Sequence, residues 1–253
     1  MTDHIFPPWR LDQWKAVDDR VRGGASTSHL DTVENLGRAS SSRARFWGHL
    51  DIDTLGGAGF ASQRFVFGPE PLHLPRHLFK GITIDIVDSG SSLRKSSVHT
   101  YTLVLKTSLS NRTQPPNVPP SPEPASLSYE ASFTVGEPSS LGSKTRSIHL
   151  NINDFIATYR GRELPRSDPR YQPFHSEKIY ELSLMCRSGF GEQKGDFELV
   201  IQGISRWRKE SKSKAIVSFF SSIWNRATRW ILSWFSTEGK VQLQDEEKQG
   251  LLE

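Results

Sequence analysis

The stretch Val98–Lys106, VHTYTLVLK, alternates between side chains suited to the two faces of a half-buried β-strand. Tyr101, Leu103 and Leu105 share one face, and most of the other face is polar. A period of two, together with β-branched and aromatic residues, is typical of such strands. This stretch therefore predicts a strand with one face in a hydrophobic core.

The same pattern recurs along the chain in segments separated by turn residues. These segments are Ala44–Asp51, Gly81–Val87, Ser128–Thr134, Ser147–Ile152, Ile179–Cys186 and Asp196–Ile201. The chain also contains 19 glycines and 15 prolines, and 35% of its 253 residues are hydrophobic. Many short strands, frequent turns and enough apolar side chains for a core predict an all-β sandwich or jelly roll over residues 1–205. The residues expected in or near its core are Trp14, Phe46, Phe60, Tyr101, Phe133, Leu182, Phe197 and Leu199.

A proline-rich segment, NRTQPPNVPPSPEPAS, interrupts the strand pattern at residues 111–126. Proline cannot donate a backbone hydrogen bond within a sheet, so the segment is predicted to be a loop inserted between two strands. Two roles agree with this composition. One is a docking segment for a proline-recognition domain, and the other, favoured because loops accept extra length at little cost, is a tolerated surface insertion.

Beyond residue 205 the pattern changes to that of a helix. From Ile216 to Trp234 apolar residues recur at intervals of three and four, and polar residues fall largely on the opposite face. This periodicity predicts a basic amphipathic α-helix within residues 206–236, a segment with seven basic residues and one acidic residue. Residues 237–253 contain two lysines and five acidic residues, a composition that predicts an acidic disordered tail.

The predicted helix is better suited to lying on an anionic membrane surface than to crossing a membrane. Arg226 and Arg229 sit well inside it, and each would cost about 2.5–3.5 kcal/mol near the bilayer centre. A flat orientation keeps both arginines among the headgroups while aromatic rings enter the acyl boundary. The membrane-contact candidates are Phe219, Phe220, Trp224, Trp230 and Trp234. The alternative is that this apolar stripe packs on the sandwich or on a partner protein.

No group of residues in the sequence has the spacing of a catalytic or metal site. His73 and His77 are four residues apart, but they flank Pro75, which would break a helix that aligned them. The single cysteine, Cys186, falls in an apolar strand and is predicted to be a core residue. The sequence therefore predicts a protein that is not an enzyme and that holds no metal and no cofactor.

The net charge of +4 is concentrated outside the predicted sandwich, since residues 1–205 carry only about +1. A nucleic-acid-binding domain would spread basic charge over its folded face, so nucleic acid is not an expected partner. The first residues, MTDHIFPPWRLDQW, lack the apolar run of a secretory signal. They also lack the arginine- and serine-rich composition of a mitochondrial presequence.

Four motifs occur in a fixed order over about 190 residues. They are Trp14 with Asp18-Asp19, Gly23-Gly24 and Ser26-Thr27-Ser28; Phe46–Gly48 with Gly59-Phe60-Ala61-Ser62 and Arg64; Phe155–Arg162, which ends in Arg-Gly-Arg; and Gly195–Ile201. Each motif is weak alone, but together and in this order they resemble the family of complex I intermediate-associated protein 30.

The resemblance implies a galactose-binding-like jelly roll. It also implies a non-enzymatic assembly factor or chaperone for mitochondrial NADH:ubiquinone oxidoreductase, with complex I subunits or assembly intermediates as its partners. The implied location is the mitochondrial inner membrane, and the cytoplasm is the alternative because the N-terminal residues do not resemble a presequence. The alternative function is a carbohydrate-binding module, for which Trp9, Trp14 and Trp47 are the candidate stacking residues.

Charged residues in or beside these motifs are candidates for a surface that binds a partner or an anion. They are Asp18, Asp19, Arg20, Arg22, Arg64, Arg160 and Arg162. Guanidinium groups grip carboxylates and phosphates with two parallel hydrogen bonds, which favours the arginines for this role. The alternative is that they form ion pairs with aspartates inside the domain. Two adjacent strand carboxylates point to opposite faces, so Asp18 and Asp19 are not expected to act together.

Overall fold

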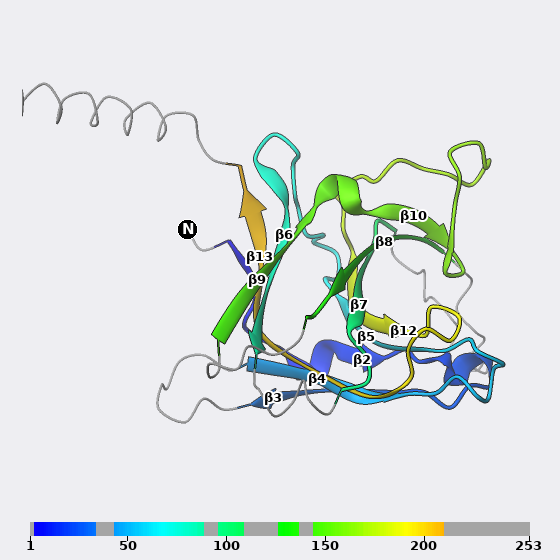
Figure 1. Ribbon diagram of the computed structural model, residues 1–253. Coiled ribbons are helices and arrows are strands. Elements are labelled where there is room, and N and C mark those ends of the chain that lie inside the picture. Colours follow the sequence, from blue (N-terminus) through cyan, green and yellow to red (C-terminus); the bar gives the residue numbers. More distant parts are fainter. Residues whose placement is uncertain (1–2, 34–42, 89–95, 109–125, 137–143, 210–253) are drawn as a thin grey trace, which may run out of the picture. The chain divides into compact units, whose positions relative to one another are not determined.

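Two antiparallel sheets face each other in the computed structural model of the protein (Figure 1). The structure describes residues 3–33, 43–88, 96–108, 126–136 and 144–209. Sheet A contains β1 (His4–Phe6), β3 (Thr27–Val33), β4 (Arg43–Leu50), β6 (Phe79–Asp88), β9 (Lys144–Asn151) and β13 (Gly195–Arg208). Sheet B contains β2 (Trp14–Ala16), β5 (Phe60–Val66), β7 (Thr100–Lys106), β8 (Leu127–Thr134), β10 (Ile156–Tyr159), β11 (Arg162–Glu163) and β12 (Glu181–Arg187). Three short 3-10 helices are η1 (Leu11–Gln13), η2 (Asp19–Arg22) and η3 (Ile152–Asp154).

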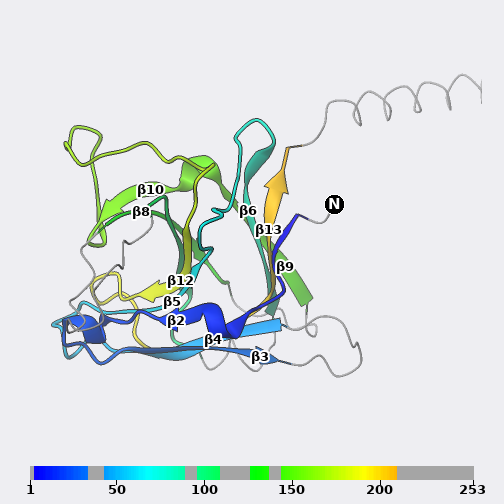
Figure 2. The same cartoon turned by 180° about the vertical axis from the view of Figure 1, so that it is seen from behind.

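The strand order confirms a β-sandwich. Sheet A runs β3-β4-β13-β6-β9, with β1 added to β13, and sheet B runs β11-β10-β8-β7-β12-β5-β2. The chain passes from one sheet to the other several times, and Figure 2 shows the same two layers from behind. Each of the seven segments with period-two alternation overlaps a strand, because each can turn one apolar face to the space between the sheets.

The core lies between the two sheets. Phe46 from β4 and Phe197 from β13 are at most 2% exposed, and their ring centroids are 5.0 Å apart. Tyr101 from β7 packs against both rings from the opposite sheet. Seven of the eight predicted core residues are buried, and the exception is Phe60, which is only partly buried. Alternation along β5 places Ala61 in the core, so Phe60 falls on the outer face of sheet B.

A second aromatic cluster ties the N-terminal residues to sheet B. The ring of Phe6 lies 5.2 Å from Trp9, 5.1 Å from Trp14 and 4.9 Å from Phe65, measured between centroids. All four side chains are buried. Trp9 and Trp14 are therefore part of the core and are not available as sugar-stacking surfaces.

The last strand, β13, continues to Arg208, three residues beyond the boundary expected at residue 205. Arg206 and Arg208 each lie 5.2 Å from the ring centroid of Phe79, and both pair with Asp3. These contacts explain why residues 206–208 extend the sheet and do not begin a helix. The predicted helix from 210 to 236 and the tail at 237–253 lie outside the described residues, as does the proline-rich segment up to residue 125.

None of the helices in the described part of the chain is long and apolar enough to cross a membrane.

Replacing Phe197 by alanine should lower the free energy of unfolding by about 3–5 kcal/mol, because it leaves a cavity beside Phe46 and Tyr101. Urea denaturation of the whole chain measures this loss. Phe190→Ala is the matched control, since that ring is 83% exposed and its removal should change stability by less than about 0.5 kcal/mol. Equal losses in the two variants would contradict this placement of the core.

Candidate functional site

The outer face of sheet B, turned away from the core, holds a groove of about 2140 Å³. We call it the sheet B groove. Its floor is formed by outward side chains of β5, β7, β8 and β12, among them Ser62, Arg64, Glu130, Ser132, Ser183 and Arg187. Strand register aligns these side chains in rows, since Ser183 lies opposite both Arg64 and Val104, and Val104 lies opposite Glu130. The groove therefore follows from the alternation that also builds the core.

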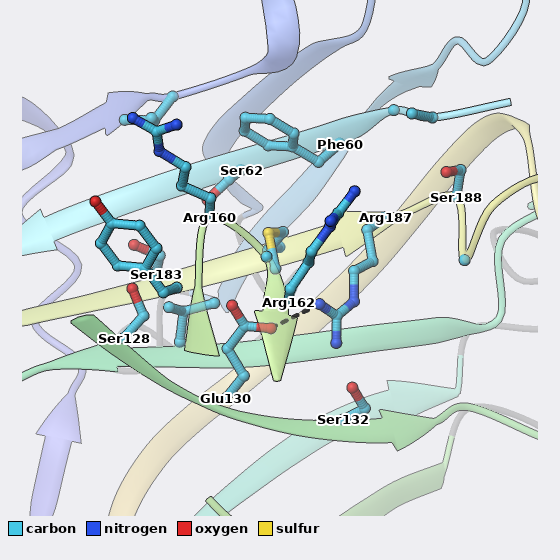
Figure 3. Close-up of a pocket in the computed structure, with 18 of the residues that line it drawn as sticks. Phe60, Ser62, Ser128, Glu130, Ser132, Arg160, Arg162, Ser183, Arg187 and Ser188 are labelled. Atoms are coloured by element: carbon cyan, nitrogen blue, oxygen red, sulfur yellow. Dashed lines mark hydrogen bonds and ion pairs between the residues drawn. The ribbon is translucent and has the colours of Figure 1, made fainter. Parts of the chain in front are cut away.

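Carboxylates neutralise most of the cations on and beside the floor. Glu130 is 7% exposed, and its Oε2 accepts a hydrogen bond from Arg187 Nη1 at 2.6 Å (Figure 3). Its Oε1 accepts from the Thr158 hydroxyl at 2.7 Å. Glu181 lies 3.0 Å from Lys106 Nζ and 3.8 Å from Arg64 Nη1. Burial of a charge is tolerated only when it is paired in this way.

Arg64 is one of the predicted partner-binding residues, and its position argues against that role. Its side chain is 9% exposed and lies beside Glu181 in the floor of the groove. A guanidinium held there offsets the buried negative charge of Glu181 within sheet B. For Arg64, the alternative of ion pairing inside the domain is therefore the better interpretation, although its partner is a glutamate.

Three other predicted arginines stand at the rim of the groove. Arg22 ends η2, whereas Arg160 and Arg162 belong to the hairpin between β10 and β11, and Figure 3 shows Arg160 and Arg162 reaching over the groove. The hairpin turn consists of Arg160 and Gly161, both at positive φ (54° and 74°), as a two-residue type I′ turn requires. All three arginines are exposed, and they form none of the ion pairs found between described residues.

A further cation at the rim, Arg170, is already paired. It donates to both carboxylate oxygens of Asp168, at 2.9 Å and 2.7 Å, and its guanidinium lies 4.6 Å from the ring centroid of Tyr159. These hydrogen bonds lower the pKa of Asp168 to about 2. Both members of this pair therefore stay charged near neutral pH, and the pair adds no net charge to the groove.

Asp18 and Asp19, predicted as partner-binding candidates, have a structural role. Both are buried, at 3% and 1% exposure. Asp18 accepts hydrogen bonds from the backbone N–H and hydroxyl of Ser28 and from the backbone N–H of Ser62. Asp19 accepts from the N–H and hydroxyl of Ser26 and from the N–H of Phe60. The two carboxylates thus connect β3 of sheet A, together with the residue just before it, to β5 of sheet B. We call them the aspartate clamp.

The aspartate clamp corrects two sequence-based expectations. Asp18 precedes η2 and Asp19 begins it, so the rule that adjacent strand side chains point to opposite faces does not apply. Arg20 remains 58% exposed and donates to Asp18 at 3.2 Å, and it does not line the groove. Of the seven charged candidates, only Arg22, Arg64, Arg160 and Arg162 come together in the groove.

Glycines near the clamp have two different roles. Gly23, Gly56 and Gly57 adopt positive φ, which favours glycine, but Gly24 does not. A Cβ on Gly24 would lie 2.4 Å from the carboxylate of Asp19, so this glycine is needed for space.

An apolar end of the groove has no clear signal in the sequence pattern. Val21 is 68% exposed and Phe190 is 83% exposed, and both line the groove with the partly buried Phe60. The guanidinium of Arg22 lies 5.5 Å from the ring centroid of Phe60. Phe190 could have been noticed only as an aromatic residue between two glycines, in a segment that period-two alternation does not cover.

Titratable groups do not assemble into a metal-binding arrangement in the described part of the chain. No three histidine, cysteine, aspartate or glutamate side chains there are placed to hold a metal ion. His49 contacts Asp196, and His149 contacts Thr83. Burial raises the pKa of the Cys186 thiol well above its usual range, which disfavours the reactive thiolate.

Trp47, the third candidate for sugar stacking, lies on sheet A and not in the groove. Its ring stacks on His29 with centroids 4.4 Å apart, and Arg45 lies over it at 5.1 Å. Its Nε1 donates to Asp31, whose pKa is lowered chiefly by hydrogen bonds from Arg45. None of the three tryptophans therefore belongs to the groove.

Comparison with known proteins finds a matching family, a relative and two solved structures. The family model of Complex I intermediate-associated protein 30 (CIA30) matches residues 5–201. The "Uncharacterized protein C9E9.15" of Schizosaccharomyces pombe is 37% identical over 196 residues, which cover 78% of each chain. The solution structure of CtCBM11 covers 83% of this chain and 95% of its own, with 10% identity and a TM-score of 0.48. A structure of the carbohydrate-binding modules from the β-sandwich superfamily covers 81% and 61%, with 7% identity and a TM-score of 0.38.

Replacing Gly24 by alanine should lower the free energy of unfolding by about 1–3 kcal/mol, because displacing the Asp19 carboxylate leaves buried donors without an acceptor. Urea denaturation measures the loss. In an Asp19→Ala background the same substitution should cost less, since the displaced carboxylate is gone. The same loss in both backgrounds would show that the strain at Gly24 has another source.

Proposed function

Because the chain belongs to the family of complex I intermediate-associated protein 30, we propose that it is a non-enzymatic assembly factor that holds a protein partner in the sheet B groove. The partner is a subunit or an assembly intermediate of mitochondrial NADH:ubiquinone oxidoreductase, and the protein works at the inner membrane. Family membership supports the kind of function. The sheet B groove supports the proposed location of the partner-binding site.

The observation that carries this proposal is the contrast between the floor and the rim of the groove. On the floor, Glu130 and Arg187 neutralise each other's charge in a hydrogen-bonded ion pair. At the rim, Arg22, Arg160 and Arg162 are exposed and have no carboxylate partner among the described residues. Unpaired guanidinium groups beside exposed apolar side chains are typical of protein-binding surfaces, where arginine and aromatic residues dominate the binding energy.

A carbohydrate-binding role is less well supported by the same groove. Sugar rings stack on flat aromatic platforms. The floor between Ser62 and Ser132, formed by β5, β7, β8 and β12, carries serine, threonine, valine, methionine and charged side chains instead. The aromatic residues of the lining, Phe60, Tyr159 and Phe190, come from strand ends and a loop.

The membrane part of the proposal rests on the sequence of residues 210–236. Its broad apolar face is rich in tryptophan and phenylalanine, and its polar face contains Arg226 and Arg229. Such a segment binds an anionic membrane surface through buried aromatic rings and headgroup contacts. Attachment there would bring the groove close to membrane-bound partners.

The protein-binding role can be tested by isolating the tagged whole chain from mitochondria. We expect complex I subunits or intermediates to copurify with the wild-type chain. The Arg22→Glu/Arg162→Glu variant should retain at most about a tenth of this material, since it removes two guanidiniums and adds two repelling carboxylates. Quantitative mass spectrometry of the eluate is the measurement.

The matched control is Arg10→Glu/Arg166→Glu, which changes the charge equally at two exposed arginines outside the groove. It should recover the wild-type amount. Loss of copurification in both variants, or in neither, would contradict the assignment to the groove. Absence of any complex I protein from the wild-type eluate, together with glycan-array binding, would favour the carbohydrate alternative.

Membrane attachment can be tested by liposome flotation of the whole chain. We expect it to float with anionic vesicles and much less with zwitterionic vesicles, because each basic residue near an anionic surface adds about 1 kcal/mol. Trp230→Glu/Trp234→Glu should abolish flotation, since a charge replaces each interfacial ring. If this variant floats as well as the wild type, the segment does not contact lipid in the way proposed.

A further inference from the structure

The loop after β12 holds an aromatic side chain in solvent at a cost to the fold. Gly189, Phe190 and Gly191 have successive positive φ values of 57°, 60° and 98°. Glycine adopts this region readily, but a bulky residue such as phenylalanine seldom does, and its backbone is strained there. The Phe190 ring is 83% exposed, so burial within this chain does not offset that strain.

The side chain of Gln193 fixes this loop in place. Its Oε1 accepts from the backbone N–H groups of Thr100 and His99 at 3.1 Å and 3.3 Å. Its Nε2 donates to the carbonyl oxygens of Thr100 at 2.8 Å and Arg187 at 2.7 Å. The exposed ring therefore stands on a loop that is fastened to β7 and to the end of β12. Such a ring is already positioned for a partner and loses little freedom on binding.

The ring belongs to the apolar end of the sheet B groove. Val21 and Phe60 line the same end, and Arg22 brings a positive charge beside them. Arg160 and Arg162 add two more guanidiniums from the β10–β11 hairpin. The groove thus combines an apolar anchor point with three exposed arginines that form no ion pair with another described residue.

Basic residues outnumber acidic residues in the lining of the groove. Eight lysines and arginines line the groove, compared with four aspartates and glutamates. Two of those four acidic residues, Glu130 and Asp168, already pair with Arg187 and Arg170. Glu181, which lies beside the lining, also pairs with Arg64 and Lys106, so the excess positive charge lies mainly at the rim. Charge complementarity therefore calls for a ligand that carries several negative charges.

We propose that the sheet B groove binds an extended acidic segment of the partner protein that carries large apolar side chains. An apolar side chain of this segment packs against Phe190 and Val21, and the carboxylates of the segment pair with Arg22, Arg160 and Arg162. The hydroxyl groups on the floor, such as those of Ser132 and Ser183, suit the hydrogen-bonding groups of an extended backbone. This inference names the ligand chemistry of the proposed protein-binding site and rests on that function.

A peptide fits these features better than the other anionic ligands. A membrane surface is flat, so it would meet the rim but leave the serine-lined floor unused. Single-stranded nucleic acid is held by aromatic stacking along a groove, whereas Ser62, Ser132 and Ser183 occupy the floor here. Carboxylates next to apolar side chains match both the cations and the anchor.

The experiment measures fluorescence anisotropy of the whole chain with a labelled peptide of about 12 residues that alternates glutamate and leucine, long enough to span roughly 40 Å when extended. We expect saturable binding that weakens with added salt. Versions with glutamine for glutamate, or serine for leucine, should each bind at least about tenfold more weakly, because each removes one of the two kinds of contact.

Phe190→Ser should weaken binding of the parent peptide by about tenfold. The matched control is Leu78→Ser, which removes an exposed apolar side chain outside the groove and should leave the affinity unchanged. Equal binding of the acidic and glutamine peptides, or equal effects of the two variants, would overturn the inference. So would binding of anionic vesicles or of single-stranded RNA that Phe190→Ser abolishes while the peptide remains unbound.

The result is separable from the test of the proposed function. If complex I proteins copurify through Arg22 and Arg162 but the acidic peptide does not bind, the assembly role stands and the ligand chemistry is wrong. If the peptide binds through Phe190 but no complex I protein copurifies, the groove binds acidic segments and the partner is a protein outside complex I.

Discussion

The aspartate clamp is the contact on which the rest of this sandwich depends. Asp18 and Asp19 place two buried carboxylates between the sheets. Asp18 accepts hydrogen bonds from the backbone N–H groups of Ser28 in sheet A and Ser62 in sheet B, and Asp19 accepts from those of Ser26 and Phe60. Hydrogen bonds to a charged acceptor are stronger than neutral ones, and the same donors would be costly to bury unpaired. The clamp also requires space, which Gly24 provides by lacking a Cβ.

The clamp connects the fold to the surface of the groove. Asp19 begins η2 and accepts the backbone N–H of Phe60, so the short helix and the start of β5 are fixed to one point. Val21 and Arg22 lie within that helix and line the groove. These two of the residues proposed to meet a partner are thus held by the same contacts that join the two sheets, which gives that part of the surface a defined geometry.

Similar residues in the motifs have different roles, and only their surroundings reveal which. Arg20 covers the clamp, Arg64 balances a buried glutamate, and Arg22 stays exposed at the groove. Phe190 was not recognisable as a candidate, because its importance depends on a strained backbone and on a glutamine that fastens its loop. Phe60 was expected in the core, yet alternation along β5 puts it at the end of the groove.

The sequence alone determined the class of fold and the family. Alternation is a local property, so a stretch such as Val98–Lys106 predicts a strand without knowledge of its neighbours, and four ordered motifs were enough to identify relatives. The tertiary structure alone decided which charges are paired within the fold and which stay exposed at the groove. That decision depends on contacts such as that between Asp18 and Ser62, which are 44 residues apart, because burial and pairing are set by residues that meet only when the sheets close.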